Sequence, residues 1–113
     1  MSEYPVTFCI VVTTIDSEAG AKELARAALA ARLAACVQIA PIRSLYEWNG
    51  ELRDEPELLV QMKARVEDFG ALVAAIRASH PYEVPEILRL DIAAGDADYL
   101  DWAAKATARD RDA

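Results

Sequence analysis

Apolar positions recur every second residue in some segments and at helical spacing in others, and this alternation divides the chain into elements. Residues 5–13, PVTFCIVVT, are short and rich in β-branched side chains, which predicts a strand. Both parities of this segment are largely apolar, so we expect the strand to be buried on both faces.

Three segments carry the helical period. The first helix can be capped by Asp16 or Ser17 and is expected to run to about Leu33, with small alanines that allow close approach to a sheet. A second apolar stripe covers 65–79. A third helix is predicted over 96–108, where an aspartate serves as the cap.

The middle of the chain reads as a long hairpin. Residues 36–48 and 51–64 are predicted strands, joined by Asn-Gly at 49–50. This pair readily takes the positive φ angles that a tight type I′ turn requires. Pro41 and Pro56 cannot donate to a strand ladder, so each is expected at an edge or a bulge.

A last strand is predicted over 86–92, which completes the order β-α-β-β-α-β plus a C-terminal helix. This order is the split-βαβ, ferredoxin-like pattern of the α+β class. We expect a four-stranded antiparallel sheet with two helices on one face. The length suits a single domain over 1–113.

The second face of this sheet would normally meet water. Cys9, Val11, Leu59 and Ile87 are expected to add apolar groups to it. The hairpin strands are also far longer than the usual five or six residues, and the excess needs a partner. We therefore expect this face or the hairpin edge to be covered by other copies of the chain in a closed ring, which satisfies all edges.

Composition narrows the classes of function. Apolar residues make up 54% of the chain and its net charge is −7. An acidic surface repels phosphate backbones, so nucleic acid is not expected as a partner. No apolar run reaches transmembrane length and the N-terminus lacks a basic signal-peptide region, so no membrane association is expected. Two cysteines are too few for a disulfide scaffold, which favours a reduced, cytoplasmic protein.

Four blocks of sequence resemble the CutA family of divalent-cation tolerance proteins. They are TT at 13–14, AACVQI at 34–39, YEWNGELRDEPELLVQMK at 46–63 and HPYEVPEI at 80–87, the last being the most specific. The resemblance spans the chain from about Val6 to Trp102. Glu47 and Ala64 depart from the family pattern, which often has an aromatic residue and a threonine there.

The resemblance implies a fold, an assembly and a cellular role. CutA proteins form tight homotrimers of ferredoxin-like subunits and are similar in fold to PII-type signalling proteins. This agrees with the ring of subunits expected from the strand lengths. The implied function is divalent-cation tolerance by a trimeric metal-binding protein without enzymatic turnover.

Candidate metal ligands are Cys36, His80 and Glu83, with Glu57 as a further carboxylate. Thiolate and imidazole suit copper and zinc, and copper (Cu2+) is the first candidate among the divalent cations. Neither Cys36 nor His80 belongs to a chelating pair in sequence. Each also has a structural reading: a cysteine packed in the core and a histidine that binds the last carbonyls of a helix.

A cleft between subunits is the hypothesis for a ligand site. Trp48, Lys63 and Tyr82 are the candidate residues for a small molecule, and the whole expected lining is Cys36, Trp48, Lys63, His80, Tyr82 and Glu83. The aromatic residues can equally be interface residues with wet polar tips.

Other classes of function fit the sequence less well. Acylphosphatases share the fold pattern but need a Gly-rich anion loop with an arginine, whereas the loop TTIDSEAG after the first strand is acidic. A Cys–His nucleophile pair lacks a visible group to orient the imidazole. The alternatives that stay open are a PII-like trimer binding a small-molecule effector and a protein-binding scaffold.

Overall fold

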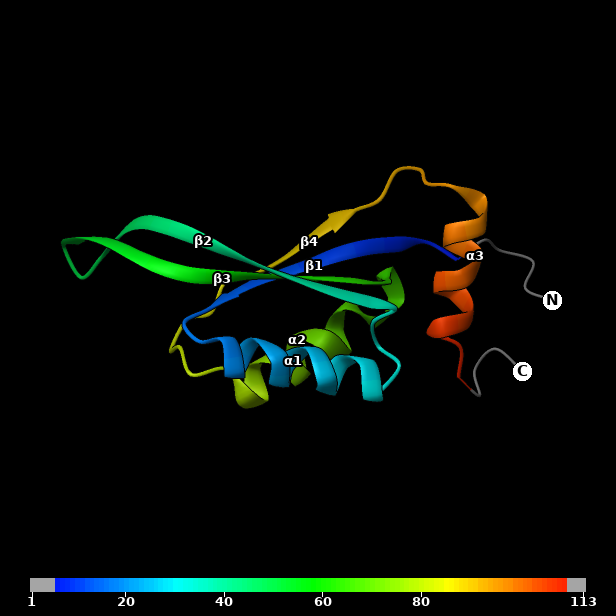
Figure 1. Ribbon diagram of the computed structural model, residues 1–113, viewed down its shortest axis with the longest axis horizontal. Helices are drawn as coiled ribbons and strands as arrows, with labels where there is room; N and C mark the ends of the chain where they lie inside the picture. Colours follow the sequence, from blue (N-terminus) through cyan, green and yellow to red (C-terminus); the bar gives the residue numbers. More distant parts are fainter. Residues whose placement is uncertain (1–5, 110–113) are drawn as a thin grey trace.

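The computed structural model describes residues 6–109, which form one four-stranded sheet and its helices (Figure 1). The elements in chain order are β1 (Phe8–Ile15), α1 (Glu18–Ala30), β2 (Cys36–Trp48), β3 (Glu51–Arg65), a 3-10 turn (Val66–Asp68), α2 (Phe69–Ser79), β4 (Ile87–Asp91) and α3 (Ala97–Ala106). The predicted order of elements is confirmed. Pro5, at the start of the predicted first strand, lies outside the described residues.

The sheet is antiparallel, with the strand order β2-β3-β1-β4. The chain is therefore a mixed α+β protein with the predicted four-stranded antiparallel sheet, in which β1 and β3 are the central strands. Helices α1 and α2 lie together below the sheet in Figure 1, whereas α3 stands at the far end of the strands from the hairpin turn. Ser17 caps α1, because its hydroxyl accepts a hydrogen bond from the Gly20 N–H at 3.1 Å.

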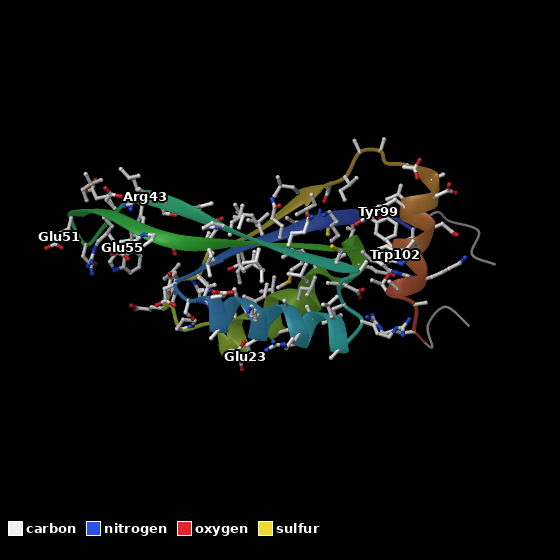
Figure 2. The ribbon with its side chains drawn as sticks, viewed as in Figure 1. Glu23, Arg43, Glu51, Glu55, Tyr99 and Trp102 are labelled. Atoms are coloured by element: carbon white, nitrogen blue, oxygen red, sulfur yellow. The ribbon has the colours of Figure 1, made fainter. Side chains whose placement is uncertain are left out.

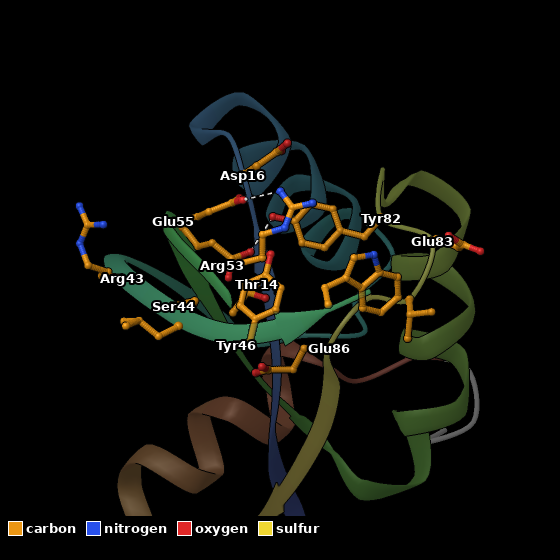
Figure 3. Close-up of a pocket in the computed structure, with 14 residues that line it drawn as sticks. Thr14, Asp16, Arg43, Ser44, Tyr46, Arg53, Glu55, Tyr82, Glu83 and Glu86 are labelled. Atoms are coloured by element: carbon orange, nitrogen blue, oxygen red, sulfur yellow. Dashed lines mark hydrogen bonds and ion pairs between the residues drawn. The ribbon is translucent and has the colours of Figure 1, made fainter. Parts of the chain in front are cut away.

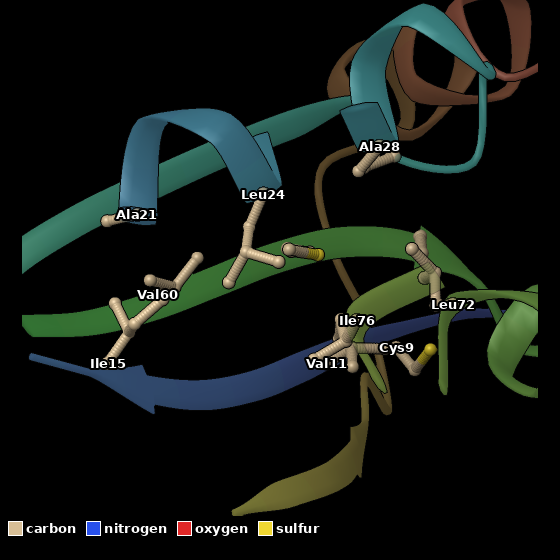
Figure 4. Close-up of a cluster of buried hydrophobic side chains, with 12 residues drawn as sticks. Cys9, Val11, Ile15, Ala21, Leu24, Ala28, Val60, Leu72 and Ile76 are labelled. Atoms are coloured by element: carbon tan, nitrogen blue, oxygen red, sulfur yellow. The ribbon is translucent and has the colours of Figure 1, made fainter. Parts of the chain in front are cut away.

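The main core lies between the sheet and helices α1 and α2 (Figure 4). Cys9 and Val11 of β1, together with Met62 of β3, face Leu24 and Leu72 in this layer and are all but fully buried. In β1, the parity expected on the open face is therefore the covered one, and Ile87 of β4 also packs against this core. The sequence alone did not show which parity the helices would choose, because both are apolar.

The opposite parity forms the open face of the sheet. Val12 lies beside Leu88 and Ile10 beside Leu90 in the β1–β4 register. Leu59 also belongs to this face, because it pairs with Thr14 rather than with a core residue. Leu88 and Leu90 are 53% and 51% exposed. The expected apolar second face thus exists, with Leu59 on it as predicted, whereas Cys9, Val11 and Ile87 face the helices.

The β2–β3 hairpin projects well beyond the rest of the sheet (Figure 1). β1 pairs only with Leu58–Arg65 of β3, so residues 51–57 pair with β2 alone. Pro41 lies on the edge strand β2, and Pro56 lies where β3 has lost its second neighbour, so both prolines occupy edges as predicted. The dimensions are 53 × 26 × 20 Å.

Helix α3 is fastened to the end of the sheet by a buried arginine. Arg65, 3% exposed, donates to the Thr107 hydroxyl and to the Ala104 carbonyl, each at 2.8 Å. Phe8 and Ala103 form the centre of a small second core beside it. No helix within residues 6–109 has the length and apolar character needed to cross a membrane.

Candidate functional site

A cleft of about 740 Å³ opens at the base of the projecting hairpin (Figure 3). Three segments distant in sequence line it: the end of β1, both arms of the hairpin, and the loop that follows α2. Its aromatic residues are Tyr46, Trp48 and Tyr82. Its carboxylates are Asp16, Glu55, Glu57, Glu83 and Glu86. A volume of this size suits a small organic molecule.

His80 fixes the loop after α2 against the end of β1. Its Nε2 lies 2.7 Å from the Thr14 carbonyl oxygen, and the Tyr82 N–H donates to Nδ1 at 3.1 Å. Because Nδ1 accepts, the proton is on Nε2 and the ring is neutral. His80 ends α2, as expected, but its ring binds a strand carbonyl instead of the last helix carbonyls.

Tyr82 extends from this loop to the hairpin. Its hydroxyl donates to Glu57 Oε2 at 2.6 Å, and its ring stands edge-on to that of His80, with centroids 4.7 Å apart. Burial raises the pKa of the Tyr82 hydroxyl, and the hydrogen bond and charge of Glu57 raise it further. The neutral phenol is therefore the form that this site holds.

Glu57 is the one buried carboxylate among those lining the cleft, with 8% of its surface exposed. Within the described part of the chain, its carboxylate receives the Tyr82 hydroxyl and no lysine, arginine or histidine pairs with it. The two arginines that line the cleft each form an ion pair with another carboxylate of the hairpin. Arg43 pairs with Asp54 at 2.7 Å. Arg53 pairs with Glu55 at 3.5 Å (Figure 3).

Cys36 and Lys63 lie at the other end of the sheet from this cleft. They are partners in the β2–β3 register, and the Lys63 ammonium donates to the side chain of Gln38. Cys36 is a half-buried free thiol next to Tyr99 of α3, and it contributes, after desolvation, to the raised pKa of that tyrosine. Cys36 is four residues along β2 from Ala40, which separates it by roughly 13 Å from the level of Thr14 and His80.

Of the expected lining, the structure thus brings together Trp48, Tyr82 and Glu83, with His80 immediately behind them. It does not bring Cys36 or Lys63 to them within one chain. Across residues 6–109, no three histidine, cysteine or acidic side chains gather as a group that could hold a metal ion. Both nitrogens of His80 are also engaged, so one subunit alone does not fit a metal with the predicted ligands.

Several cleft residues carry no signal in the sequence. Asp16 was expected only as a possible cap of the first helix, and neither Arg53 nor Glu86 belonged to the expected lining. They meet the aromatic residues only because the hairpin extends past β1 and the loop after α2 folds back beneath it. The clue available was the dense mixture of aromatic and acidic residues in YEWNGELRDEPE and HPYEVPEI.

The fold and the cleft define an α+β protein of split-βαβ topology, with a ligand-sized cleft next to an open sheet face. The model of the family "CutA1 divalent ion tolerance protein" matches residues 9–106. The chain belongs to this family, as its sequence blocks indicated.

Similar proteins support this assignment. The divalent-cation tolerance protein CutA of Thermus thermophilus is 45% identical over 82% of this chain and 91% of its own. Protein CutA of Homo sapiens is 38% identical over 91% of this chain, which spans only 58% of that longer protein. The structure of the periplasmic divalent cation tolerance protein CutA from Archaeoglobus fulgidus superposes with a TM-score of 0.87 at 31% identity, covering 89% of this chain and 99% of that one.

Proposed function

We propose that the protein acts in divalent-cation tolerance as a homotrimer that binds metal without enzymatic turnover, with copper as the first candidate. One observation carries this proposal: by the strand register, Cys36, Trp48 and Lys63 share the face of the sheet opposite α1 and α2. Copies of the chain that cover this face would bring the two ends of neighbouring sheets together.

In this arrangement the candidate ligands come from different subunits. The Cys36 thiol of one subunit would approach the loop that carries His80 and Glu83 in another. Thiolate, imidazole and carboxylate together suit copper or zinc. His80 would have to release its contact with Thr14 or with Tyr82 in order to coordinate. The same boundary would place Lys63 near Trp48 and Tyr82, the residues proposed for a small-molecule ligand.

The apolar open face supports the assembly. Leu88 and Leu90 are half exposed there, and Leu45 and Leu52 on the projecting hairpin are 62% and 76% exposed. Apolar surface of this extent is typical of a protein contact. Both cysteines are free, which favours a reducing compartment, and we propose that the protein works in the cytoplasm as a single domain over 1–113.

Native mass spectrometry with and without stoichiometric Cu(II) tests this proposal. We expect a trimer that takes up to three copper ions, with uptake lost in Cys36→Ser and in His80→Ala. Asp101→Asn, which removes an exposed carboxylate on α3, should bind as the wild type does. Parallel measurements with Zn(II) separate ligation from oxidation of the thiol by copper.

The outcomes divide the proposal into two parts. A trimer without specific copper or zinc would overturn the metal site but leave the assembly. A monomer at micromolar concentration would overturn the assembly and, with it, the site that needs two subunits.

A further inference from the structure

One lysine of the sheet has no carboxylate partner within its own chain. Among residues 6–109, the ammonium of Lys63, near the end of β3, donates only to the side-chain oxygen of Gln38. Lys63 is half-buried and lies on the face of the sheet opposite α1 and α2. The other cations of the described strands each form an ion pair with a carboxylate: Arg43, Arg53, Arg65 and Arg89. The charge of Lys63 is therefore placed for a partner that approaches this face from outside the chain.

Glu57 is the complementary group on the same strand. Its carboxylate is buried and receives the Tyr82 hydroxyl, and no lysine, arginine or histidine of the described chain pairs with it. Glu57 and Lys63 have the same parity in β3 and share one face, but six residues along a strand separate them by roughly 20 Å. An ion pair requires nitrogen and oxygen within about 4 Å. Each chain therefore carries both halves of a pair that it cannot form by itself.

The trimer proposed above brings these two halves together. In a closed ring each contact joins two different surface patches, so one end of a sheet meets the opposite end of the next. Lys63 is the register partner of Cys36, and the proposed assembly brings the Cys36 end of one subunit to the loop after α2 in another. Tyr82 of that loop is bound to Glu57 at 2.6 Å. The ammonium that arrives with Cys36 therefore meets the buried carboxylate.

The charge around Glu57 favours this approach. Asp16, Glu83 and Glu86 also line the cleft (Figure 3), and none of them has an ion pair with a described residue. Both arginines of the lining already pair with other carboxylates of the hairpin. The cleft of a single chain is therefore electronegative, and electrostatic complementarity orients the Lys63 patch of a second copy toward it.

We propose that the partner's Lys63 enters the cleft at the hairpin base and pairs with the buried Glu57, so that each cleft is built from two chains. The proposal rests on the trimer of the proposed function but not on metal binding. The ammonium supplies the counter-charge of the carboxylate, while Tyr82 holds that carboxylate in place. Because both charges lose water at the contact, the loss of one partner destabilises the contact more than the loss of both.

Dissociation of the assembled full-length protein in urea tests the pair. Light scattering at a fixed protein concentration gives the urea midpoint at which half of the trimer has dissociated, and EDTA is present so that metal does not contribute. The variants are Lys63→Met, Glu57→Gln and the double variant. We expect each single variant to lower the midpoint by about 1 M or more, because one buried charge is left unpaired. The double variant should lie closer to the wild type than either single variant does.

Lys22→Met is the matched control. Lys22 is an exposed lysine on α1 that pairs with Glu18 of the same helix, away from the sheet. The substitution removes the same charge from the chain as Lys63→Met does. It should change the urea midpoint by no more than about 0.3 M, since exposed ion pairs contribute little.

Substitutions of Lys63 provide a second test if Glu57→Gln fails to fold, because they leave Glu57 in place. Lys63→Arg keeps the charge and should remain a trimer. Lys63→Glu sets two carboxylates against each other and should give smaller species at micromolar concentration. Far-UV circular dichroism of the same samples shows that the subunits keep their helices.

The outcomes separate this pair from the assembly on which it rests. An unchanged urea midpoint in Lys63→Met, persistence of the trimer in Lys63→Glu, or additive losses in the double variant would each overturn the pair and leave the assembly standing. A wild-type monomer at micromolar concentration would overturn the assembly and the pair together. Copper uptake is measured separately, so failure of the metal site leaves this test unaffected.

Discussion

Tyr82 joins the two halves of the cleft through a single hydroxyl. Its ring packs on His80, and its hydroxyl donates to the buried Glu57. His80 is two positions away in sequence, whereas Glu57 lies on the hairpin, 25 positions away. The partner of Glu57 shows that this tyrosine helps to hold the hairpin base against the loop after α2.

Replacing Tyr82 with phenylalanine should therefore lower the free energy of unfolding by about 1–2 kcal/mol, because Glu57 loses its hydrogen bond and stays buried. Urea denaturation near neutral pH measures the change. Tyr46→Phe is the matched control, since Tyr46 lines the same cleft and is 40% exposed. Equal losses in the two variants would show that the Glu57 contact is not special.

The raised pKa of Tyr82 also predicts that the free energy of unfolding depends on pH. The pKa of Tyr82 in the fold lies above its ordinary value of 10.0, so its stabilising contribution is complete below about pH 10 and is lost as the pH rises further. Above that pH, the unfolding free energy of the wild type should fall more steeply than that of Tyr82→Phe. Parallel curves would contradict this.

Gly20 of α1 has a structural role that its place in the sequence does not reveal. Glycine costs stability inside a helix, and the sequence offers no reason for it at this position. In the structure, a Cβ at Gly20 would lie 2.8 Å from Ile15 Cδ1 and 2.9 Å from the capping hydroxyl of Ser17. The glycine therefore protects both the cap of α1 and the approach of the helix to β1.

Helix α3 is the element whose position depends most on a few polar contacts. Figure 2 shows it standing apart from α1 and α2, with Tyr99 and Trp102 on the side of the helix nearer the strands, where both remain partly exposed. Arg65 binds its C-terminal turn from the end of β3, and Arg32 donates to the Ala108 carbonyl at 2.7 Å. These cations also suit the negative end of the helix dipole.

Arg65→Ala should accordingly release α3 and lower the free energy of unfolding by about 3 kcal/mol, since two hydrogen bonds from a buried charge are lost. Urea denaturation gives the magnitude, and faster proteolysis after residue 96 locates the change. Arg26→Ala, an exposed arginine on α1, should be close to neutral. Unchanged proteolysis in Arg65→Ala would contradict the tethering role.

The molecule as a whole is more extended than its length requires. Its radius of gyration is 15.3 Å, against roughly 13 Å for a compact domain of this size. The hairpin accounts for the difference, because about half of each arm has no third strand beside it. Such a shape is unfavourable for an isolated chain and supports the proposed assembly.

Introducing charge on the open face tests that assembly. The double substitution Leu88→Asp and Leu90→Asp should convert a trimer, with three times the 12.4 kDa mass of the chain, into smaller species. Size-exclusion chromatography with light scattering measures the mass. Leu29→Asp alters a 43% exposed leucine on α1 and should leave the mass unchanged. Persistence of the trimer in the double variant would place the contact elsewhere.

The sequence by itself determined the order of the elements, and it placed the hairpin turn at the right residues. These features depend on side-chain period, helix caps and turn chemistry, all of which act between residues a few positions apart. Asn49 and Gly50 do have positive φ angles, and β2 and β3 begin and end within one residue of the predicted bounds. The four sequence blocks that resemble the CutA family could be recognised for the same reason.

Only the tertiary structure decided which side of β1 meets the helices and which residues meet at the cleft. Both parities of β1 are apolar, so its local pattern contains no preference. The Thr14–His80 and Glu57–Tyr82 contacts join residues 66 and 25 positions apart, and they exist because the strand register fixes where the hairpin base and the loop after α2 come together. Cys36 stays distant from His80 within one chain for the same reason: they lie at different levels along the strands.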